Sequence, residues 1–213
     1  MLLKSIIKEN FLSDSELTSI SETVYSYNKI YDDIINDFQF SEYYIWEYYK
    51  SQFSNIKEIL HEKLTNLIGS DMIIDHSHIL SSSTPYNVHT DYFQQKNFPF
   101  LEPAYTLIIP LDNFDSNTIA FEQNSTIKSF REYLETEPRI LSDEKRISQD
   151  FIDKYLSHID PKYFDYLSLK EIFPWKKGNL YACDRKYFHT SDNYHTRGVE
   201  RKQALVFWTS VKK

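Results

Sequence analysis

Tyr86-Asn87-Val88-His89-Thr90-Asp91 is the stretch of sequence on which the prediction of the fold depends. On an extended strand, side chains two residues apart point to the same face, so the His89 imidazole and the Asp91 carboxylate can reach one metal ion. Two histidines and one carboxylate on one face of an iron leave three positions open for oxygen and a co-substrate. A His-X-Asp triplet also occurs by chance in solvated loops, so the hypothesis of a metal site needs a second histidine.

The second histidine is expected in the C-terminal part of the chain. A strand pattern, a turn and His189 follow one another in residues 178–191, and Arg201 comes twelve residues later (201 − 189). Arg201 opens another strand pattern, in which alternation places Arg201, Gln203, Leu205 and Phe207 on one face. An arginine that points into an apolar barrel is costly unless an anion pairs with it. A guanidinium binds a dicarboxylate through two parallel hydrogen bonds, so we expect Arg201 to bind such an anion.

Two neighbouring residues compete for these roles. His195 is an alternative to His189, and Arg197 is an alternative to Arg201. Both lie in residues 194–198, which are typical of a loop, so we favour His189 and Arg201.

Other residues that could carry chemistry have simpler interpretations. His76 and His78 resemble the paired histidines of cupin metal sites, but no glutamate follows at the short spacing that such a site needs. We therefore expect one buried and one exposed histidine on a strand. His158, like His61, lies in a polar helical stretch and is expected at the surface. The one cysteine, Cys183, is expected to be a small buried core residue.

The N-terminal third of the sequence is typical of helices. Ser13 and Glu16 form a capping box, and apolar residues then recur every three or four positions at Leu17, Ile20, Val24 and Tyr27. A second helix is predicted over residues 42–54, where a tyrosine-rich stretch would pack against a sheet. A third is predicted over residues 56–68, ended by Gly69.

Strand patterns dominate the remainder of the chain. They cover residues 72–80, 105–111, 118–122, 178–184 and 203–209, with a charged, helix-like insert over residues 127–172. Short strands without regular strand–helix alternation predict an antiparallel barrel or sandwich, interrupted by the insert. Because no linker or internal repeat is evident, we expect one domain over residues 1–213.

Composition and charge disfavour a nucleic-acid partner and a membrane span. The chain has 213 residues and a net charge of −7, which disfavours a nucleic-acid partner because phosphate binding needs clustered Lys and Arg. No apolar run is long enough to cross a membrane, and no secretory signal is evident. A single cysteine cannot form an intramolecular disulfide. Together these features lead us to expect a cytoplasmic protein.

The order and spacing of the motifs resemble those of the 2-oxoglutarate/Fe(II)-dependent dioxygenases, in the broad group that includes the prolyl hydroxylases and the phytanoyl-CoA hydroxylases. The resemblance covers residues 86–208 apart from the insert, and includes the Tyr-x-x-His-x-Asp pattern at residues 86–91. Two features depart from the family. Asp115-Ser116-Asn117 replaces its glycine-rich turn, and 98 residues (189 − 91) separate Asp91 from His189.

The resemblance implies an α+β fold with a mainly β core, a double-stranded β-helix or jelly roll. Residues 71–126 and 173–213 would form this core, residues 1–70 a helical support, and residues 127–172 the helical insert. It also implies Fe(II) held by His89, Asp91 and His189, with 2-oxoglutarate bound by Arg201 beside Tyr86 and Gln203. O2 would occupy the remaining position on the metal.

The implied activity is hydroxylation of a small molecule or a peptidyl side chain, with release of succinate and CO2. Tyr92, Phe93 and Trp175 are expected as walls of the substrate site, and the insert as a cover over its mouth. The alternative is a non-catalytic cupin or jelly-roll protein that keeps the barrel and binds a metal or ligand without turnover.

Overall fold

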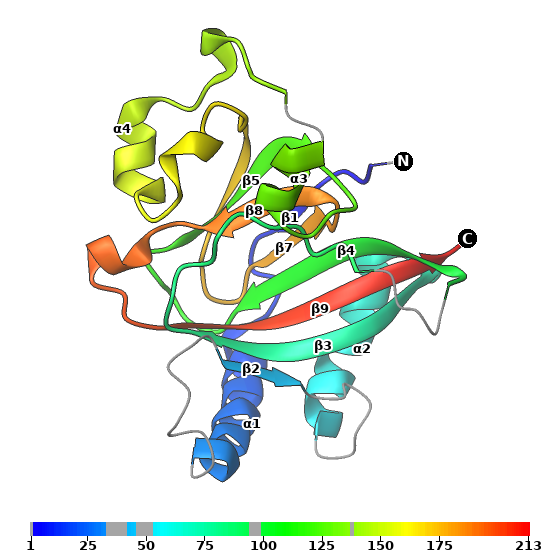
Figure 1. Ribbon diagram of the computed structural model, residues 1–213. Helices are drawn as coiled ribbons and strands as arrows, with labels where there is room; N and C mark the ends of the chain where they lie inside the picture. The colour runs from blue at the N-terminus through cyan, green and yellow to red at the C-terminus, as the bar shows by residue number, and fades with distance from the viewer. Residues whose placement is uncertain (1, 33–41, 46–52, 94–98, 137–138) are drawn as a thin grey trace.

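Two antiparallel sheets form the centre of the computed structural model, which describes residues 2–32, 42–45, 53–93, 99–136 and 139–213 (Figure 1). The larger sheet has six strands in the order β1-β7-β4-β9-β3-β2 and the smaller has three in the order β6-β5-β8. The strands of the larger sheet are β1 (Ile6–Lys8), β7 (Leu180–Asp184), β4 (Leu101–Pro110), β9 (Lys202–Lys212), β3 (Met72–Ser82) and β2 (Glu42–Ile45). Those of the smaller sheet are β6 (Leu169–Pro174), β5 (Asn117–Asn124) and β8 (Tyr187–Ser191). The architecture is the predicted mainly β jelly roll.

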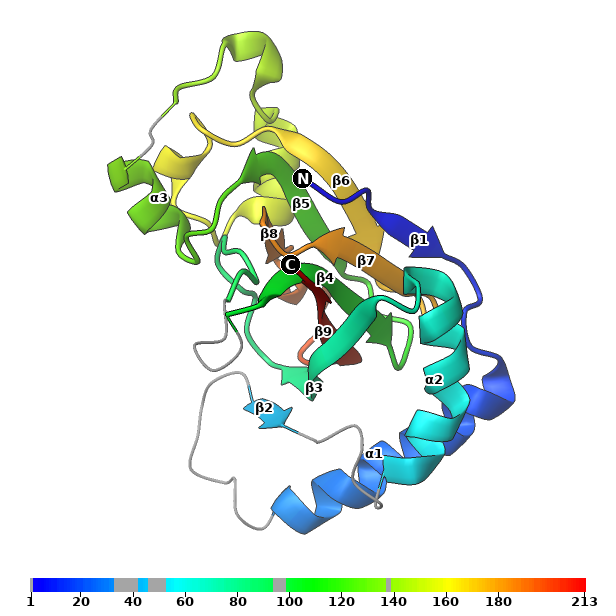
Figure 2. The ribbon, with the colours of Figure 1, turned by 90° about the vertical axis from the view of Figure 1, so that its right-hand side faces the viewer.

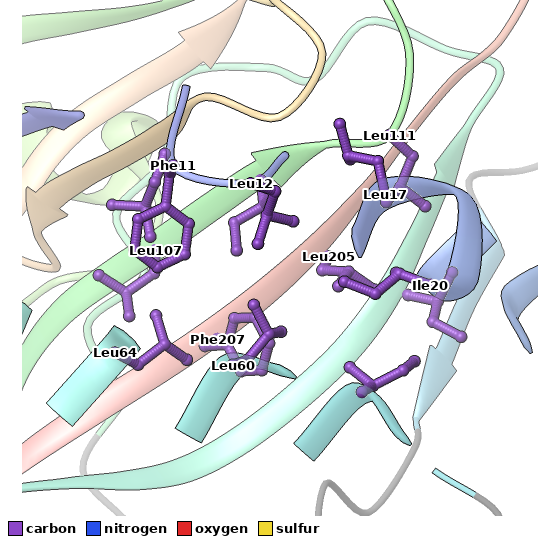
Figure 3. Close-up of a cluster of buried hydrophobic side chains, with 14 of the residues drawn as sticks. Phe11, Leu12, Leu17, Ile20, Leu60, Leu64, Leu107, Leu111, Leu205 and Phe207 are labelled. Carbon is purple, nitrogen blue, oxygen red and sulfur yellow. The ribbon is translucent and has the colours of Figure 1, made fainter. Parts of the chain in front are cut away.

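Two helices, α1 (Asp14–Asp32) and α2 (Ser54–Ile68), cover the outer face of the larger sheet (Figure 2). Every second residue of the central strands faces them, including Leu107, Leu205 and Phe207, and all three side chains are fully buried. Figure 3 shows how Leu60 and Leu64 of α2 lie against these strands. Burial of such side chains stabilises the fold by about 1.5–3 kcal/mol each.

The predicted ends of these helices are confirmed. The backbone N–H of Ser13 donates to Glu16 Oε2 at 2.7 Å, and the backbone N–H of Glu16 donates to Ser13 Oγ at 3.4 Å. This is the reciprocal pair of a capping box, which satisfies N–H groups that have no partner within the helix. Gly69 follows the last residue of α2 with φ of 91°, a conformation that favours glycine.

The helix predicted over residues 42–54 is wrong at its start. Residues 42–45 form strand β2, which pairs with β3 so that Tyr43 lies opposite Leu80. Aromatic and β-branched residues suit a sheet edge, and here pairing with β3 outweighs local helical propensity. Residues 46–52, with most of the tyrosine-rich stretch, lie outside the described residues. Strand β1 was not predicted from the sequence.

The insert departs from its prediction at its C-terminal boundary. It contains α3 (Phe130–Thr136), α4 (Gln149–Phe151) and short helical turns, but residues 169–172 already belong to strand β6. Its apolar residues Leu156 and Phe164 pack on Ile119 and Phe188 of the smaller sheet. The described part of the insert therefore covers the outer face of that sheet (Figure 1), and its role as a cover over the substrate mouth stays a prediction.

Within the part of the chain that the structure describes, no helix is long and apolar enough to cross a bilayer.

Candidate metal centre and adjoining cavity

Three side chains that the sequence singled out lie together between the sheets. Potential ligand atoms of His89, Asp91 and His189 are all within 4.8 Å of one another. His89 and His189 form an isolated antiparallel bridge, in which each backbone N–H donates to the carbonyl of the other at 3.0 and 2.8 Å. This bridge fixes the segment after β3 against β8. The three side chains therefore converge from segments far apart in the sequence.

Hydrogen bonds orient both imidazoles. The Nδ1 atom of His89 lies 2.7 Å from the carbonyl oxygen of Asn87, and that of His189 lies 3.1 Å from the carbonyl oxygen of Tyr187. The Nε2 atoms are then turned toward Asp91, at 3.8 Å from Oδ1 for His89 and 3.4 Å from Oδ2 for His189. A backbone partner at one ring nitrogen is the usual way in which a protein directs the other toward a metal.

Burial and charge set the protonation of this group. Burial, and after it the charge of His189, lowers the pKa of His89 to about 4. Burial also opposes the charged forms of Asp91 and His189, but their mutual attraction is stronger, so the pKa of Asp91 is lowered and that of His189 is raised. The hydroxyl of Thr106 donates to Asp91 Oδ2 at 2.7 Å and supports the anion. An anionic carboxylate beside histidine nitrogens is a suitable donor set for a divalent transition metal.

Arg185 supports the centre and was not predicted from the sequence. Its side chain is 1% exposed and its Nε donates to the backbone carbonyl of Asp91 at 2.9 Å. Nη1 binds Asp75 Oδ2 at 3.3 Å and also donates to the carbonyl of Thr209 at 3.2 Å. Because Arg185 lies in a polar turn 94 residues from Asp91, no sequence pattern indicates this contact.

A cavity of about 60 Å³ runs from the three candidate ligands between the two sheets. Its other walls are Leu80 and His78 of β3, Ile108 and Thr106 of β4, Thr118 of β5, Thr190 and Ser191 of β8, Val206, Trp208 and Lys202 of β9, with Tyr86 and Trp175 from the connecting segments. The three candidate ligands therefore share one cavity with a lysine, and Leu80, Ile108, Val206 and the two tryptophans give this cavity apolar walls.

That lysine, Lys202, is a buried cation. The residue is 1% exposed and its Nζ donates to Ser116 Oγ at 3.2 Å. The ammonium nitrogen also lies 3.9 Å from the ring centre of Trp175 and 4.9 Å from that of Tyr194. Burial lowers the pKa of Lys202 to about 7, against the opposing effect of Asp192. A buried ammonium held by a hydroxyl and aromatic faces is suited to bind an anion.

Arg201 and Gln203 do not line this cavity, which corrects their predicted place. The predicted shared face exists, but Leu205 and Phe207 on it pack against α1 and α2 rather than inside the barrel. Arg201 is exposed and its Nη1 donates to Ser81 Oγ at 3.0 Å, while Gln203 is half-buried. The opposite face of β9 points inward, so the cation in the cavity is the next residue, Lys202.

The predicted substrate residues are separated in the structure. Trp175 lines the cavity beside Lys202. Tyr92 is half-buried with its ring near Lys186, and Phe93 is 56% exposed; neither lines the cavity.

Among the described residues, none of the alternative histidines belongs to the metal cluster. His195 is not part of the metal cluster; its Nε2 lies 2.9 Å from the carbonyl oxygen of Ser83. His78 is buried and lines the cavity, and His76 is half-buried, with its ring centre 5.0 Å from that of Trp208. His158 was expected at the surface, but it is half-buried with Nε2 3.1 Å from the carbonyl oxygen of Tyr86.

Arg197, the alternative to Arg201, and Cys183 have structural roles outside the cavity. Arg197 pairs with Asp192 at 2.5 Å and with Asp115 at 3.0 Å. Cys183 is buried as predicted, and burial raises the pKa of its thiol.

Comparison with known proteins supports the fold. No protein-family model and no curated protein matches the sequence. Among solved structures, the chain is similar to the non-heme alpha-ketoglutarate-dependent carbocyclase SnoK from nogalamycin biosynthesis, with a TM-score of 0.59 and 13% identity over 97% of this chain and 79% of SnoK. The alpha-ketoglutarate-dependent epimerase SnoN gives 0.55 and 10% identity over 96% and 76%. HygX from Streptomyces hygroscopicus, solved with nickel and 2-oxoglutarate bound, gives 0.53 and 10% identity over 96% and 81%. The chain therefore has the fold of Fe(II)/2-oxoglutarate-dependent oxygenases.

Proposed function

We propose that the protein is an Fe(II)- and 2-oxoglutarate-dependent oxygenase. One observation carries the proposal: a cluster of two histidines and an aspartate shares a single cavity with a buried lysine. The first group suits a divalent iron and the second suits a carboxylate. A 2-oxo acid with a second carboxylate carries both partners in one molecule, because its 2-oxo carboxylate end can bind the iron and its distal carboxylate can bind the lysine.

The metal would be held by Nε2 of His89, Nε2 of His189 and a carboxylate oxygen of Asp91. The donors fit Fe(II) because neutral imidazole and carboxylate are the ligands of the facial triad, which leaves positions open. Thr106 and Arg185 would hold Asp91 in place, through its carboxylate and its backbone carbonyl. The chemistry supplied at this position is oxidation of a substrate by O2, coupled to decarboxylation of 2-oxoglutarate to succinate and CO2.

Lys202 would bind the distal carboxylate of 2-oxoglutarate, in the role that the sequence had suggested for Arg201. On β9 it lies four residues from Val206, which is paired with Ile108 and also lines the cavity. Leu80, Ile108 and Val206 would surround the methylene carbons and exclude water, which strengthens the charge interactions at both ends.

We further propose that the reaction is hydroxylation and that the substrate is a small molecule or a peptidyl side chain. Support for a small-molecule substrate comes from the solved structures of similar fold, which include a carbocyclase and an epimerase from nogalamycin biosynthesis. A cytoplasmic location is proposed from the one cysteine, which is buried and free.

Succinate release tests this function against the alternative of a non-catalytic jelly-roll protein. Wild-type protein with Fe(II) and 2-oxoglutarate would be offered a panel of amino acids, peptides and small metabolites under air. At least one compound should stimulate succinate release, and Asp91→Ala should abolish it while the protein remains folded. Tight binding of Fe(II) and 2-oxoglutarate without succinate release from any panel member would favour the non-catalytic alternative.

A further inference from the structure

A second buried carboxylate, Asp192, lies directly after β8 and apart from the candidate metal ligands. Its residue is 0% exposed. Oδ1 accepts a hydrogen bond from Ser116 Oγ at 3.0 Å, and Oδ2 accepts from Asn117 Nδ2 at 2.6 Å and from Arg197 Nη2 at 2.5 Å. A buried carboxylate costs several kcal/mol unless such partners satisfy it, so the cluster fixes Asp192 as an anion in one position.

Ser116 connects this carboxylate to the cavity. Its hydroxyl donates to Asp192 Oδ1 and accepts the hydrogen bond from Lys202 Nζ, at 3.2 Å. A hydroxyl has one proton to donate, so donation to Asp192 leaves its lone pairs for the ammonium. These two hydrogen bonds, from Ser116 to Asp192 and from Lys202 to Ser116, therefore orient the ammonium and link it to the negative charge of Asp192.

The charges around Lys202 show why this support matters. Asp192 opposes the loss of the Lys202 proton, while Arg197 favours it. Arg197 is itself shared between buried Asp192 and Asp115, whose side chain is 71% exposed. Other titratable groups at this end include Tyr194, whose ring faces the ammonium, Tyr155, whose ring lies against Arg197, and His158, whose pKa burial lowers. Among these groups, Asp192 is thus the buried anion, and it favours the charged form of Lys202.

We propose that Asp192 is a positioning residue for co-substrate binding, which acts through Ser116 to keep the Lys202 ammonium charged and aimed at the distal carboxylate of 2-oxoglutarate. This inference rests on the proposed function, since it takes 2-oxoglutarate as the anion. Asp192 is neither one of the candidate metal ligands nor one of the residues that line the cavity, so its effect should fall on binding of the co-substrate and not on the metal.

The test compares three variants loaded with Mn(II), a redox-inert substitute for Fe(II), in calorimetric titrations with 2-oxoglutarate. Asp192→Asn removes the charge at nearly constant size, and Ser116→Ala removes the link to Lys202. Asp115→Asn is the matched control, because it alters the exposed partner of Arg197. We expect the first two to raise the Kd for 2-oxoglutarate about 10-fold or more, as for a weakened charge-assisted hydrogen bond, with the control within about 2-fold. The Kd for Mn(II) should stay unchanged in all three.

A pH series separates positioning from a general structural defect. Without Asp192 the Lys202 ammonium loses its proton at a lower pH, so the affinity of Asp192→Asn should recover toward that of the wild type as the pH is lowered from 8 to 6. A structural defect would not be repaired by acid. Turnover with Fe(II) gives a further check, since KM for 2-oxoglutarate should rise while kcat at saturation changes less than about 3-fold.

The outcomes are distinct. If wild-type protein binds Mn(II) but not 2-oxoglutarate, the proposed function is wrong. If wild type binds 2-oxoglutarate and Ser116→Ala and Asp192→Asn bind it equally well, only the role of Asp192 is refuted. Should Asp192→Asn fail to fold, Ser116→Ala decides alone, because it leaves the Asp192–Arg197 pair intact. Where both single variants fold, the double variant should lose less 2-oxoglutarate binding free energy than the sum of the two single losses, because the two residues act through one contact.

Discussion

Replacement of Lys202 by methionine should make the protein more stable and at the same time weaken its binding of 2-oxoglutarate. Lys202 is 1% exposed, and its pKa of about 7 lies well below the ordinary 10.5. That difference corresponds to roughly 5 kcal/mol by which burial disfavours the ammonium. Methionine removes this cost but also loses the contacts to Ser116 and Trp175. We therefore expect the free energy of unfolding to rise by about 1–4 kcal/mol at pH 7.

The direction of the pH effect follows from the lowered pKa. Between pH 7 and 10.5 the unfolded chain binds more protons at this lysine than the folded protein does, so stability rises with pH over that range. The destabilisation is fully present below pH 7 and is gone above pH 10.5. The stability gained by Lys202→Met should therefore be largest at acid and neutral pH and should shrink as the pH rises.

Binding should change in the opposite sense. A charge-assisted hydrogen bond contributes about 1.5–3 kcal/mol, so Lys202→Met should raise the Kd for 2-oxoglutarate roughly 10- to 150-fold. Arg201→Met is the matched control on the neighbouring residue, which is exposed, and it should change stability by less than about 0.5 kcal/mol. Urea unfolding at pH 7 and calorimetry with Mn(II)-loaded protein give both quantities. Loss of 2-oxoglutarate binding in Arg201→Met, with normal binding in Lys202→Met, would refute this assignment.

Three other predictions follow from the same contacts. In the wild type, affinity for 2-oxoglutarate should fall by up to about 10-fold per pH unit above pH 7, because binding favours a Lys202 proton that the free protein is losing; a flat profile from pH 6 to 9 would contradict this. Arg185→Met should destabilise the fold by about 3–5 kcal/mol, measured by urea unfolding, because Asp75 is left buried without its cation. The same variant should weaken metal binding, because Asp91 loses the hydrogen bond to its backbone carbonyl. Unchanged unfolding and metal affinity would count against this role of Arg185. Phe207→Ala should cost about 3–5 kcal/mol, since the ring is fully buried between β9 and the helices, and a urea-derived loss below about 1 kcal/mol would show that the site is loosely packed.

Local chemistry made much of the fold predictable. The Ser13–Glu16 capping box and Gly69 mark helix ends through contacts within a few residues, and both are confirmed. The strand patterns were visible because β-branched and apolar runs were separated by turn residues. The residues at 42–45 form a strand because β3 offers an edge to pair with, and no local pattern contains that information.

The place of the cation could not be read from alternation alone. Alternation correctly groups Arg201 with Leu205 and Phe207, but it does not say which face of β9 points inward. Both faces are apolar, because one packs on helices and the other, with Val206, lines the cavity. A choice of the wrong face moves the expected cation by one residue, from Lys202 to Arg201. Only the packing of α1 and α2 resolves the ambiguity.

An oxygen-free titration of the protein with Fe(II) and then 2-oxoglutarate shows whether both bind together at His89, Asp91 and His189. We expect a visible charge-transfer band from the iron–2-oxoglutarate chelate in the wild type, and none in Asp91→Ala. In Lys202→Met the same band should appear only at higher 2-oxoglutarate concentration, because the metal ligands are intact and the anion partner is missing. Folded wild-type protein that binds Fe(II) but gives no band at any 2-oxoglutarate concentration would contradict the account.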